Sequence, residues 1–266
     1  MIVYTNLFTL KDKDPAQNRY IDMFWIWCKY MEKYSGLTPE DTIYLLADSR
    51  TCEYMEKVIK YLPTELIYTM IEYKPPVDAL EGMLRRYSLL SYPMIDSSQT
   101  ILYMDVDVLC IGNIKQIEAI PMNSLYLWRE NTLVDNFHLG EIMTAQKMRF
   151  ILEKNLAEHP GFNAGWFLFR GAALNILFTE IVLRCKNGKH DCICFEQPYF
   201  CDVVFENLFQ GAMPQIKTRF ADASWFEINM IHKLCRPTTI FLNMCGDPAQ
   251  EESHWLKMFG TILSDS

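Results

Sequence analysis

Two aspartates separated by one residue, Asp105 and Asp107, have the spacing best suited to metal chemistry in this sequence. Two carboxylates so placed can chelate one hard divalent cation, and Mg²⁺ and Mn²⁺ often share such oxygen ligands with substrate phosphates. The pair directly follows an apolar run, residues 101–104, which predicts a buried strand. Ligands of open α/β sheets bind beyond the carboxyl ends of strands. The pair is therefore a candidate metal site, with a solvated turn as the alternative.

A second triplet of the same spacing, Asp12-Lys13-Asp14, shows how little the spacing alone specifies. It follows Leu10 in a polar stretch and not a strand, so we interpret it as a solvated turn. Position at a strand end is what favours Asp105 and Asp107.

Apolar runs alternate with segments of helical period along the chain, and this alternation predicts a mostly parallel central sheet flanked by helices. No stretch of linker composition divides the sequence, so we expect one α/β domain over residues 1–266. The predicted strands cover 2–7, 42–47, 65–70, 99–104, 124–128, 165–169 and 239–243. The predicted helices cover 18–34, 51–61, 77–92, 141–158 and 174–184.

Composition narrows the class of protein. The formal net charge is −8, which argues against non-specific nucleic-acid binding. Nine cysteines, an odd number in a chain of 266 residues, indicate reduced thiols and a cytoplasmic protein. The first residues do not resemble a secretory leader, and no apolar stretch is long enough to cross a bilayer.

A cluster of thiols offers a different metal chemistry. Cys185, His190, Cys192 and Cys194 could supply ligands to zinc, but their spacing matches no standard zinc pattern. We favour their interpretation as small buried side chains and a loop histidine.

Residues 101–114, ILYMDVDVLCIGNI, resemble the DxD segment of family 8 glycosyltransferases, the glycogenin-like and galactosyltransferase-like enzymes. The resemblance implies a single GT-A domain, Rossmann-like, with a nucleotide-binding half over about residues 1–115 and a sugar and acceptor half over about 116–266. It also implies that Asp105 and Asp107 hold Mn²⁺ or Mg²⁺.

Two further segments resemble the same family in the same order. Residues 83–90 resemble the helix that carries a basic residue toward the donor diphosphate; Arg86 is the preferred match and Arg85 the alternative. Residues 161–169, GFNAGWFLF, resemble the segment that lines the donor-sugar and acceptor pocket. This match assigns Asn163, Ala164 and Gly165 to that pocket.

Two short matches extend the resemblance. Glu196 and Gln197 resemble the acidic–glutamine pair that contacts the transferred sugar, which makes them, with Asn163, the candidate catalytic residues. The first strand resembles the one whose end holds the nucleotide base, which assigns Tyr4 and Thr5 to donor binding.

The C-terminal region departs from the family pattern. Asn243 stands where the family has a metal-binding histidine, and a neutral amide oxygen is a weaker ligand than imidazole for Mn²⁺. Gly246 follows at the family spacing, and Lys257 is the nearest candidate for the phosphate-binding lysine.

The function implied is transfer of a sugar from a nucleotide sugar, UDP-sugar by resemblance, to a hydroxyl of a glycan or glycoprotein acceptor, with retention of anomeric configuration. The alternative, favoured by Asn243, is a catalytically weakened module that binds a sugar or nucleotide. A nucleotidyltransferase is a third possibility, against which the lack of glycine after the first strand counts. The sugar, the linkage and the oligomeric state stay open.

Overall fold

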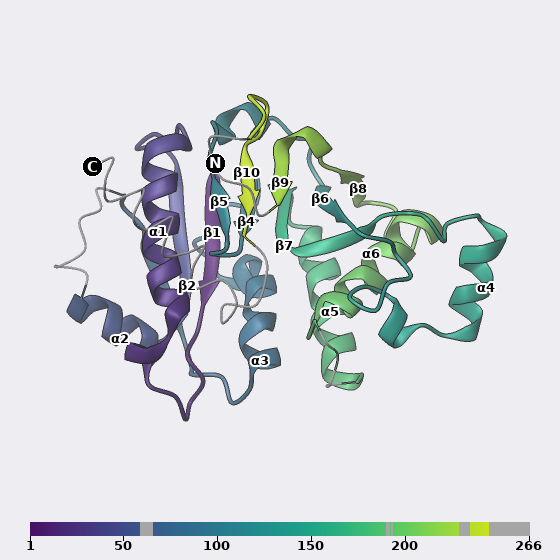
Figure 1. Cartoon of the computed structure of the whole chain (residues 1–266), viewed down its shortest axis with the longest axis horizontal. Coiled ribbons are helices and arrows are strands. Elements are labelled where there is room, and N and C mark those ends of the chain that lie inside the picture. Colours follow the sequence, from purple (N-terminus) through teal and green to yellow (C-terminus); the bar gives the residue numbers. More distant parts are fainter. Residues whose placement is uncertain (59–65, 190–191, 193, 229–234, 245–266) are drawn as a thin grey trace.

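The computed structural model describes residues 1–58, 66–189, 192, 194–228 and 235–244 (Figure 1). Its main sheet has seven strands in the order β3-β2-β1-β4-β7-β6-β8. The first four run parallel, β7 is antiparallel to both β4 and β6, and β8 is parallel to β6. These strands are β1 (Ile2–Leu7), β2 (Thr42–Asp48), β3 (Thr69–Tyr73), β4 (Ile101–Met104), β6 (Ser124–Glu130), β7 (Gly161–Arg170) and β8 (Lys217–Phe220). The predicted α/β fold with a mostly parallel sheet is confirmed.

A second sheet of three strands was not expected. Here β10 (Phe241–Asn243) lies between β5 (Val108–Cys110), to which it is antiparallel, and β9 (Phe226–Ile228), to which it is parallel. The chain leaves the main sheet in a turn closed by the Val108 amide donating to the Asp105 carbonyl at 3.0 Å. The segment 239–243 therefore forms a strand as predicted, but in this small sheet and not in the main one.

Burial on both faces explains why the central strands read as continuous apolar runs. In β4, Leu102 and Met104 face one hydrophobic core, while Ile101 and Tyr103 face the other. Neighbouring β7 divides its side chains in the same way. The sheet thus separates two cores, and only the strand ends are left to meet a ligand.

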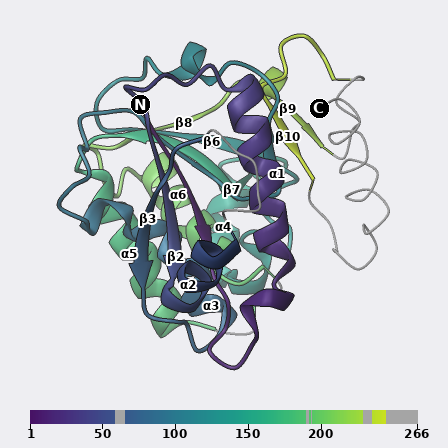
Figure 2. The ribbon, with the colours of Figure 1, turned by 90° about the vertical axis from the view of Figure 1, so that its left-hand side faces the viewer.

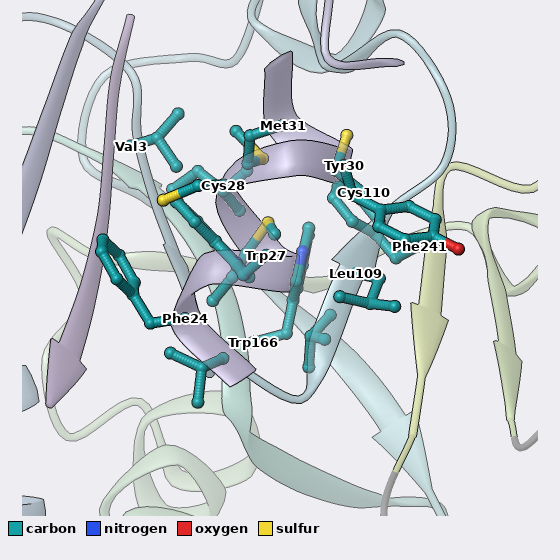
Figure 3. Close-up of a cluster of buried hydrophobic side chains, with 14 of the residues drawn as sticks. Val3, Phe24, Trp27, Cys28, Tyr30, Met31, Leu109, Cys110, Trp166 and Phe241 are labelled. Atoms are coloured by element: carbon teal, nitrogen blue, oxygen red, sulfur yellow. The ribbon is translucent and has the colours of Figure 1, made fainter. Parts of the chain in front are cut away.

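Helix α1 (Arg19–Tyr34) and the small sheet cover the first core (Figures 1 and 3). The Asn18 side chain caps the helix by accepting from the Tyr20 amide. Figure 3 shows Trp27 of α1 beside Trp166 of β7 and Leu109 of β5, all buried side chains. Helix α2 (Ser49–Val58) follows β2 near this side, and the predicted helix 51–61 runs at its end into residues outside the described ones.

The other core is covered by α3 (Ala79–Leu84), α5 (Leu174–Asn187) and α6 (Gln197–Gln210), as Figure 2 shows from a second direction. The single helix predicted over 77–92 is instead α3 followed by the 3₁₀ helix η3 (Arg85–Ser91). Asp78 starts α3 by capping the Glu81 amide. In the tighter 3₁₀ turn, residues three apart lie on one side, so Arg86 and Leu89 are both buried.

Two further differences have local causes. The helix predicted over 141–158 is shorter, α4 (Ala145–Glu153), because Thr144 caps its start and Asn155 adopts a left-handed φ of 55° after its end. Helix α6 was missed because it is buried nearly all round and so lacks an amphipathic period. The short strands β5, β8 and β9 were missed as well, and β3 begins four residues later than predicted. The remaining 3₁₀ turns are η1 (Pro15–Gln17), η4 (Ile114–Ile117), η5 (Gly140–Ile142) and η6 (Ala223–Trp225).

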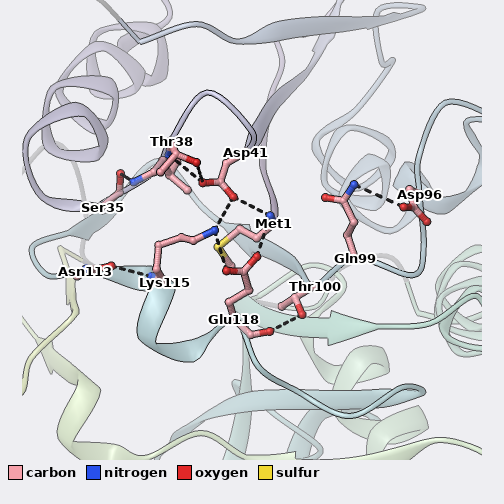
Figure 4. Close-up of polar contacts among 11 residues, drawn as sticks. Met1, Ser35, Thr38, Asp41, Asp96, Gln99, Thr100, Asn113, Lys115 and Glu118 are labelled. Carbon is pink, nitrogen blue, oxygen red and sulfur yellow. Dashed lines mark hydrogen bonds and ion pairs between the residues drawn. The ribbon is translucent and has the colours of Figure 1, made fainter.

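A group of ion pairs joins the starts of β1, β2 and η4 at the edge opposite the carboxyl ends of β1 and β2 (Figure 4). The Met1 amine contacts Asp41 at 2.7 Å and Glu118 at 3.0 Å, and Lys115 contacts the same two carboxylates at 2.8 and 2.7 Å. Although burial opposes the charge on Asp41, hydrogen bonds from Lys115 and the amine hold its pKa well below the ordinary value.

Candidate active site

Two cavities meet at the carboxyl end of β4 and share Met83, Arg86, Asp105 and Asp107 in their walls. The larger, about 380 Å³, has a volume within the usual range for small-molecule sites. The smaller is about 200 Å³. The larger cavity is also lined by Asn6, Leu7, Phe8, Thr9, Leu10, Lys13, Asp14, Gln17, Asn18, Tyr20 and Val106. The smaller is also lined by Val108, Asn163, Ala164, Gly165, Cys194, Phe195, Glu196, Gln197 and Asn243.

Asp105 is held at the junction of these cavities by backbone and side-chain contacts. Its amide donates to the Gly165 carbonyl at 2.8 Å, which ties the end of β4 to β7. The Tyr103 hydroxyl donates to one carboxylate oxygen and Arg86 lies 3.2 Å from the other. The backbone of Gly165 lies against this carboxylate: a Cβ added there would be 2.8 Å from the second oxygen. Glycine at 165 is therefore what gives the Asp105 carboxylate its room.

Arg86, and not Arg85, faces the cavities. Its side chain is only 4% exposed, and it pairs with Asp105 at 3.2 Å and with Glu196 at 3.4 Å. Burial opposes its charge, but these carboxylates and Tyr103 hold the pKa of the guanidinium well above the ordinary value. Arg85 turns outward, where it pairs with Glu81 at 3.2 Å. Arg86 is thus a permanent cation fixed within the site.

Glu196 is buried beside Arg86, with 3% of its surface exposed. Burial raises the pKa of its carboxyl group, the guanidinium of Arg86 lowers it, and the carboxylate of Asp105 raises it again. The net shift is upward. Two acidic groups thus share one arginine: Asp105 at the junction of the cavities and Glu196 in the wall of the smaller one.

Asn163 and Gln197 brace the wall of the smaller cavity through their amides. Asn163 donates to Glu130 at 2.8 Å and accepts from the Gly165 amide at 2.7 Å. Gln197 accepts from the Ala164 amide at 3.0 Å and donates to the Phe137 carbonyl at 3.0 Å. Each amide has hydrogen-bonding capacity left for a hydroxyl group. The start of α6 and the start of β7 are thereby locked together around the cavity.

Asn243 reaches the smaller cavity from β10. It pairs in register with Val108, and the next amide, of Met244, donates to the Asp107 carbonyl at 2.8 Å. The side chain is 3% exposed, and its Oδ1 is buried without a hydrogen-bond partner among the described residues. Asn243 Oδ1 is therefore one of the buried polar atoms whose hydrogen-bonding capacity the described residues leave unused.

Tyr4 and Thr5, the residues predicted to contact the nucleotide, do not line either of the two cavities. Neither side chain has exposed surface, because Tyr4 lies in the core and donates to the Arg86 carbonyl at 2.7 Å. The cavity wall starts instead at Asn6 and continues through the loop after β1. Arg50 holds this loop by donating to the carbonyls of Leu10, Lys11 and Lys13 at 3.2, 2.5 and 2.6 Å.

Some predicted residues lie outside the described ones: Gly246 and Lys257 of the donor site, and His190 of the zinc alternative. Cys185 and Cys192 belong to the second core, and the eight cysteines within the described ranges are free thiols. Among the residues that the structure describes, no three His, Cys, Asp or Glu side chains are grouped to hold a metal ion. Asp105 and Asp107 are the acidic side chains that the two cavities share.

The loop after β1 and the residues before α6 were missed from the sequence. The Asp12-Lys13-Asp14 turn is solvated as predicted, yet Lys13 and Asp14 also lie on the larger cavity. The exposed Phe195, directly before the Glu196-Gln197 pair, was not singled out either. Proximity to a matched motif was the available signal for both segments.

The overall shape is shared with solved glycosyltransferases at low sequence identity. The chain is 12% identical to mouse xyloside xylosyltransferase 1 in its apo form, with a TM-score of 0.57 over 91% of this chain and 96% of that one. It is 15% identical to the galactosyltransferase LgtC in complex with donor and acceptor sugar analogs, with a TM-score of 0.57 over 92% of this chain and 87% of that one. At these identities the likeness shows a common fold.

Sequence comparison supplies the family. No curated protein sequence gives a significant match. Within the described ranges, no helix is both long and apolar enough to span a membrane. The model of glycosyl transferase family 8 matches residues 51–208, more than half of the chain, and this span includes Arg86, the two aspartates and the Glu196-Gln197 pair. The chain therefore belongs to glycosyl transferase family 8 and is a glycosyltransferase.

Proposed function

We propose that this enzyme transfers a sugar from a UDP-sugar to a hydroxyl acceptor, that it depends on a divalent cation, Mn²⁺ or Mg²⁺, and that it retains the anomeric configuration. The observation that carries the metal dependence is the buried Oδ1 of Asn243, which has no partner among the described residues and lies on the same cavity as Asp105 and Asp107.

The residues fit such an ion. Asp105, Asp107 and Asn243 would form an all-oxygen ligand set, which suits a hard cation. An orphaned buried acceptor costs stability, and cation binding would remove that cost. When bound, the ion stabilises negative charge on the departing nucleoside diphosphate as a Lewis acid.

The cation that the chain itself contributes is Arg86. Its guanidinium lies in both cavity walls, where it can neutralise charge on a diphosphate that spans them. Because Asp105 and Glu196 already fix its position, no reorganisation is needed when charge develops on the leaving group. Lys257 remains a second candidate for the phosphates.

The nucleotide of the donor would lie in the larger cavity and its sugar in the smaller one. The wall of the larger one comes entirely from residues 6–107, which supports the proposed nucleotide-binding half, about residues 1–115. The smaller draws on residues from both proposed halves, as expected where sugar and acceptor meet. Asn163, Glu196 and Gln197 would then contact the sugar, with Ala164 and Gly165 as close backbone walls. Family resemblance supports retention.

A panel of nucleotide sugars with Mn²⁺ tests the proposal by measuring donor hydrolysis and transfer to simple glycosides. We expect one UDP-sugar to be turned over, and Asp107→Ala to lower the rate by at least about 100-fold, as for loss of other charge-stabilising groups. Asp12→Ala, in the solvated triplet of the same spacing, is the matched control and should keep the wild-type rate. Equal rates for Asp107→Ala and the wild type would refute the metal site.

The second candidate is a family member that binds nucleotide or sugar with weakened turnover, and the neutral Asn243 favours it. A thermal-shift titration separates the two readily. Stabilisation by UDP that requires Mn²⁺, together with turnover, supports the enzyme as proposed. Stabilisation by nucleotide without turnover of any donor supports the binding module.

A further inference from the structure

Phe195 combines exposure, backbone strain and a place on the smaller cavity. Its side chain is 39% exposed although it is large and apolar, and it lies in the cavity wall directly before Glu196 and Gln197. Its φ is 48°, in the left-handed region. An exposed phenyl ring in a strained conformation gains little for the fold, so its position calls for a functional reason.

The strain is unusual within this chain. Four described residues other than glycine have positive φ, and three of them are asparagines, the type that tolerates it best. Phe195 is the fourth, and it has a bulky side chain that is disfavoured there. Its amide donates to the Cys192 carbonyl at 3.1 Å, which closes the turn that directs the chain into α6.

Depth in the cavity separates Phe195 from its neighbours. Glu196 is 3% exposed and Ala164 is 2% exposed, so they lie at the cavity floor, while Phe195 lies at its solvent side. In the proposed reaction the donor sugar lies in the interior of this cavity beside Asp105, so the second substrate meets the outer residues.

We infer that the Phe195 ring is the platform on which the acceptor sugar lies, and that the acceptor hydroxyl is presented by a pyranose ring. This inference rests on the proposed function, since it places the acceptor of that reaction. A pyranose has an apolar C–H face and a rim of hydroxyl groups. Phe195 offers the apolar surface, and the spare hydrogen-bonding capacity of Gln197 and Asn163 offers partners for the rim.

The expected contribution is that of an aromatic contact. Replacement of Phe195 by alanine should raise the acceptor KM by about 3- to 10-fold, the range that one such contact is worth. The ratio of transfer to donor hydrolysis should fall by the same factor, because water needs no platform. Phe195→Tyr and Phe195→Trp, which keep an aromatic face, should keep that ratio close to wild type.

A glycine variant separates function from folding. Phe195→Gly removes the ring and also relieves the left-handed strain. We expect its melting temperature to stay within a few degrees of the wild type, while its acceptor KM is raised as much as in Phe195→Ala. A purely structural role for the ring predicts the opposite: loss of stability together with loss of transfer.

Phe137 provides a matched control. It is an exposed phenylalanine, 42%, whose carbonyl accepts a hydrogen bond from Gln197, and it is not among the residues that line either cavity. Phe137→Ala keeps that carbonyl and should leave the transfer ratio at the wild-type value. A fall in the transfer ratio as large as that of Phe195→Ala would mean that any change near the cavity entrance has this effect, which would overturn the inference.

The experiment has two measurements. The first is sugar transfer to methyl glucosides and methyl galactosides. The second, which does not depend on turnover, is saturation-transfer NMR of those glycosides with protein, UDP and Mn²⁺. An affinity for the glycosides that is about 3- to 10-fold weaker by NMR titration in Phe195→Ala, with a fall of the same size in the transfer ratio, supports the platform. A wild-type enzyme that binds glycosides through Phe195 but turns over no donor would refute the proposed function alone. A glycoside affinity in Phe195→Ala equal to that of the wild type, or transfer to a serine peptide that is insensitive to the substitution, would overturn the platform.

Discussion

Gly165→Ala tests whether the position of the Asp105 carboxylate matters for catalysis. The added Cβ would lie 2.8 Å from Asp105 Oδ2 and 3.0 Å from Asn163 Oδ1. Ordinary contacts start at 3.4 Å, so the carboxylate has to retreat by roughly 0.6 Å. It cannot do so freely, because Tyr103 and Arg86 hold its two oxygens.

The expected effect falls on activity and not on folding. Gly165 is not among the glycines with positive φ, so alanine adds no backbone strain there, and it reduces the entropy of the unfolded chain by the equivalent of roughly 0.4–1 kcal/mol. This gain offsets part of the cost of the close contact. A displacement approaching 1 Å in a site of this kind costs up to about 100-fold in rate. We therefore expect a 10- to 100-fold lower kcat, with a melting temperature within a few degrees of wild type.

The assay is Mn²⁺-dependent donor turnover, with thermal unfolding measured on the same samples. Gly211→Ala is the control with the opposite signature: Gly211 ends α6 at φ 67° and has nothing within 4 Å of an added Cβ. That variant should lose about 1 kcal/mol of stability and keep its turnover. If Gly165→Ala turns over donor at the wild-type rate, the carboxylate position is not critical and the reasoning fails.

Three further predictions concern other parts of the molecule. Asn243→Leu removes an unsatisfied buried acceptor, so the variant without metal should melt at the same or a higher temperature than the wild type. The same variant should no longer be stabilised by UDP with Mn²⁺. Asn243→His should bind Mn²⁺ more tightly in a titration. Arg50→Lys cannot bond three carbonyls of the loop after β1 at once, so calorimetry should show about 10-fold weaker UDP binding, with rates at saturating donor little changed. Asp41→Asn should destabilise the protein by about 1–3 kcal/mol at pH 7. Because folding lowers the pKa of Asp41, the stability difference between wild type and variant should shrink as the pH falls below the ordinary value of 3.8. Urea unfolding at several pH values measures this difference. A difference that grows toward low pH would contradict the ion-pair assignment.

The half of the site that follows apolar strands could be predicted from the sequence. Asp105 and Asp107 were found because a buried strand must end at the ligand-binding edge, and the structure places both on the two cavities. Family resemblance preferred Arg86 to Arg85, but the residue pattern alone could not decide between them, because the choice depends on a switch from α to 3₁₀ geometry that begins at Arg85. Only the fold shows that the buried residue of the two is Arg86.

Contacts between segments far apart in the chain were beyond prediction. Tyr4 and Thr5, predicted to contact the nucleotide, have no exposed surface because a strand covered on both faces buries them, and the cavity wall starts one residue later at Asn6. The small sheet depends on pairing Asn243 with Val108, a long-range match of two three-residue strands. Helix α6 was hidden because burial on all sides removes the period that reveals helices.

The reversed direction of β7 has a consequence for how this enzyme can be altered. Because β7 runs antiparallel to β4, it begins where β4 ends, so the connection over residues 131–160 leads directly to the wall of the smaller cavity at Asn163, where we propose that the sugar binds. Changes in the length or composition of that connection could reshape the entrance for a second substrate while β1 to β4 keep the nucleotide in place. Loop exchange over this connection is thus a route to new acceptors on an unchanged donor site.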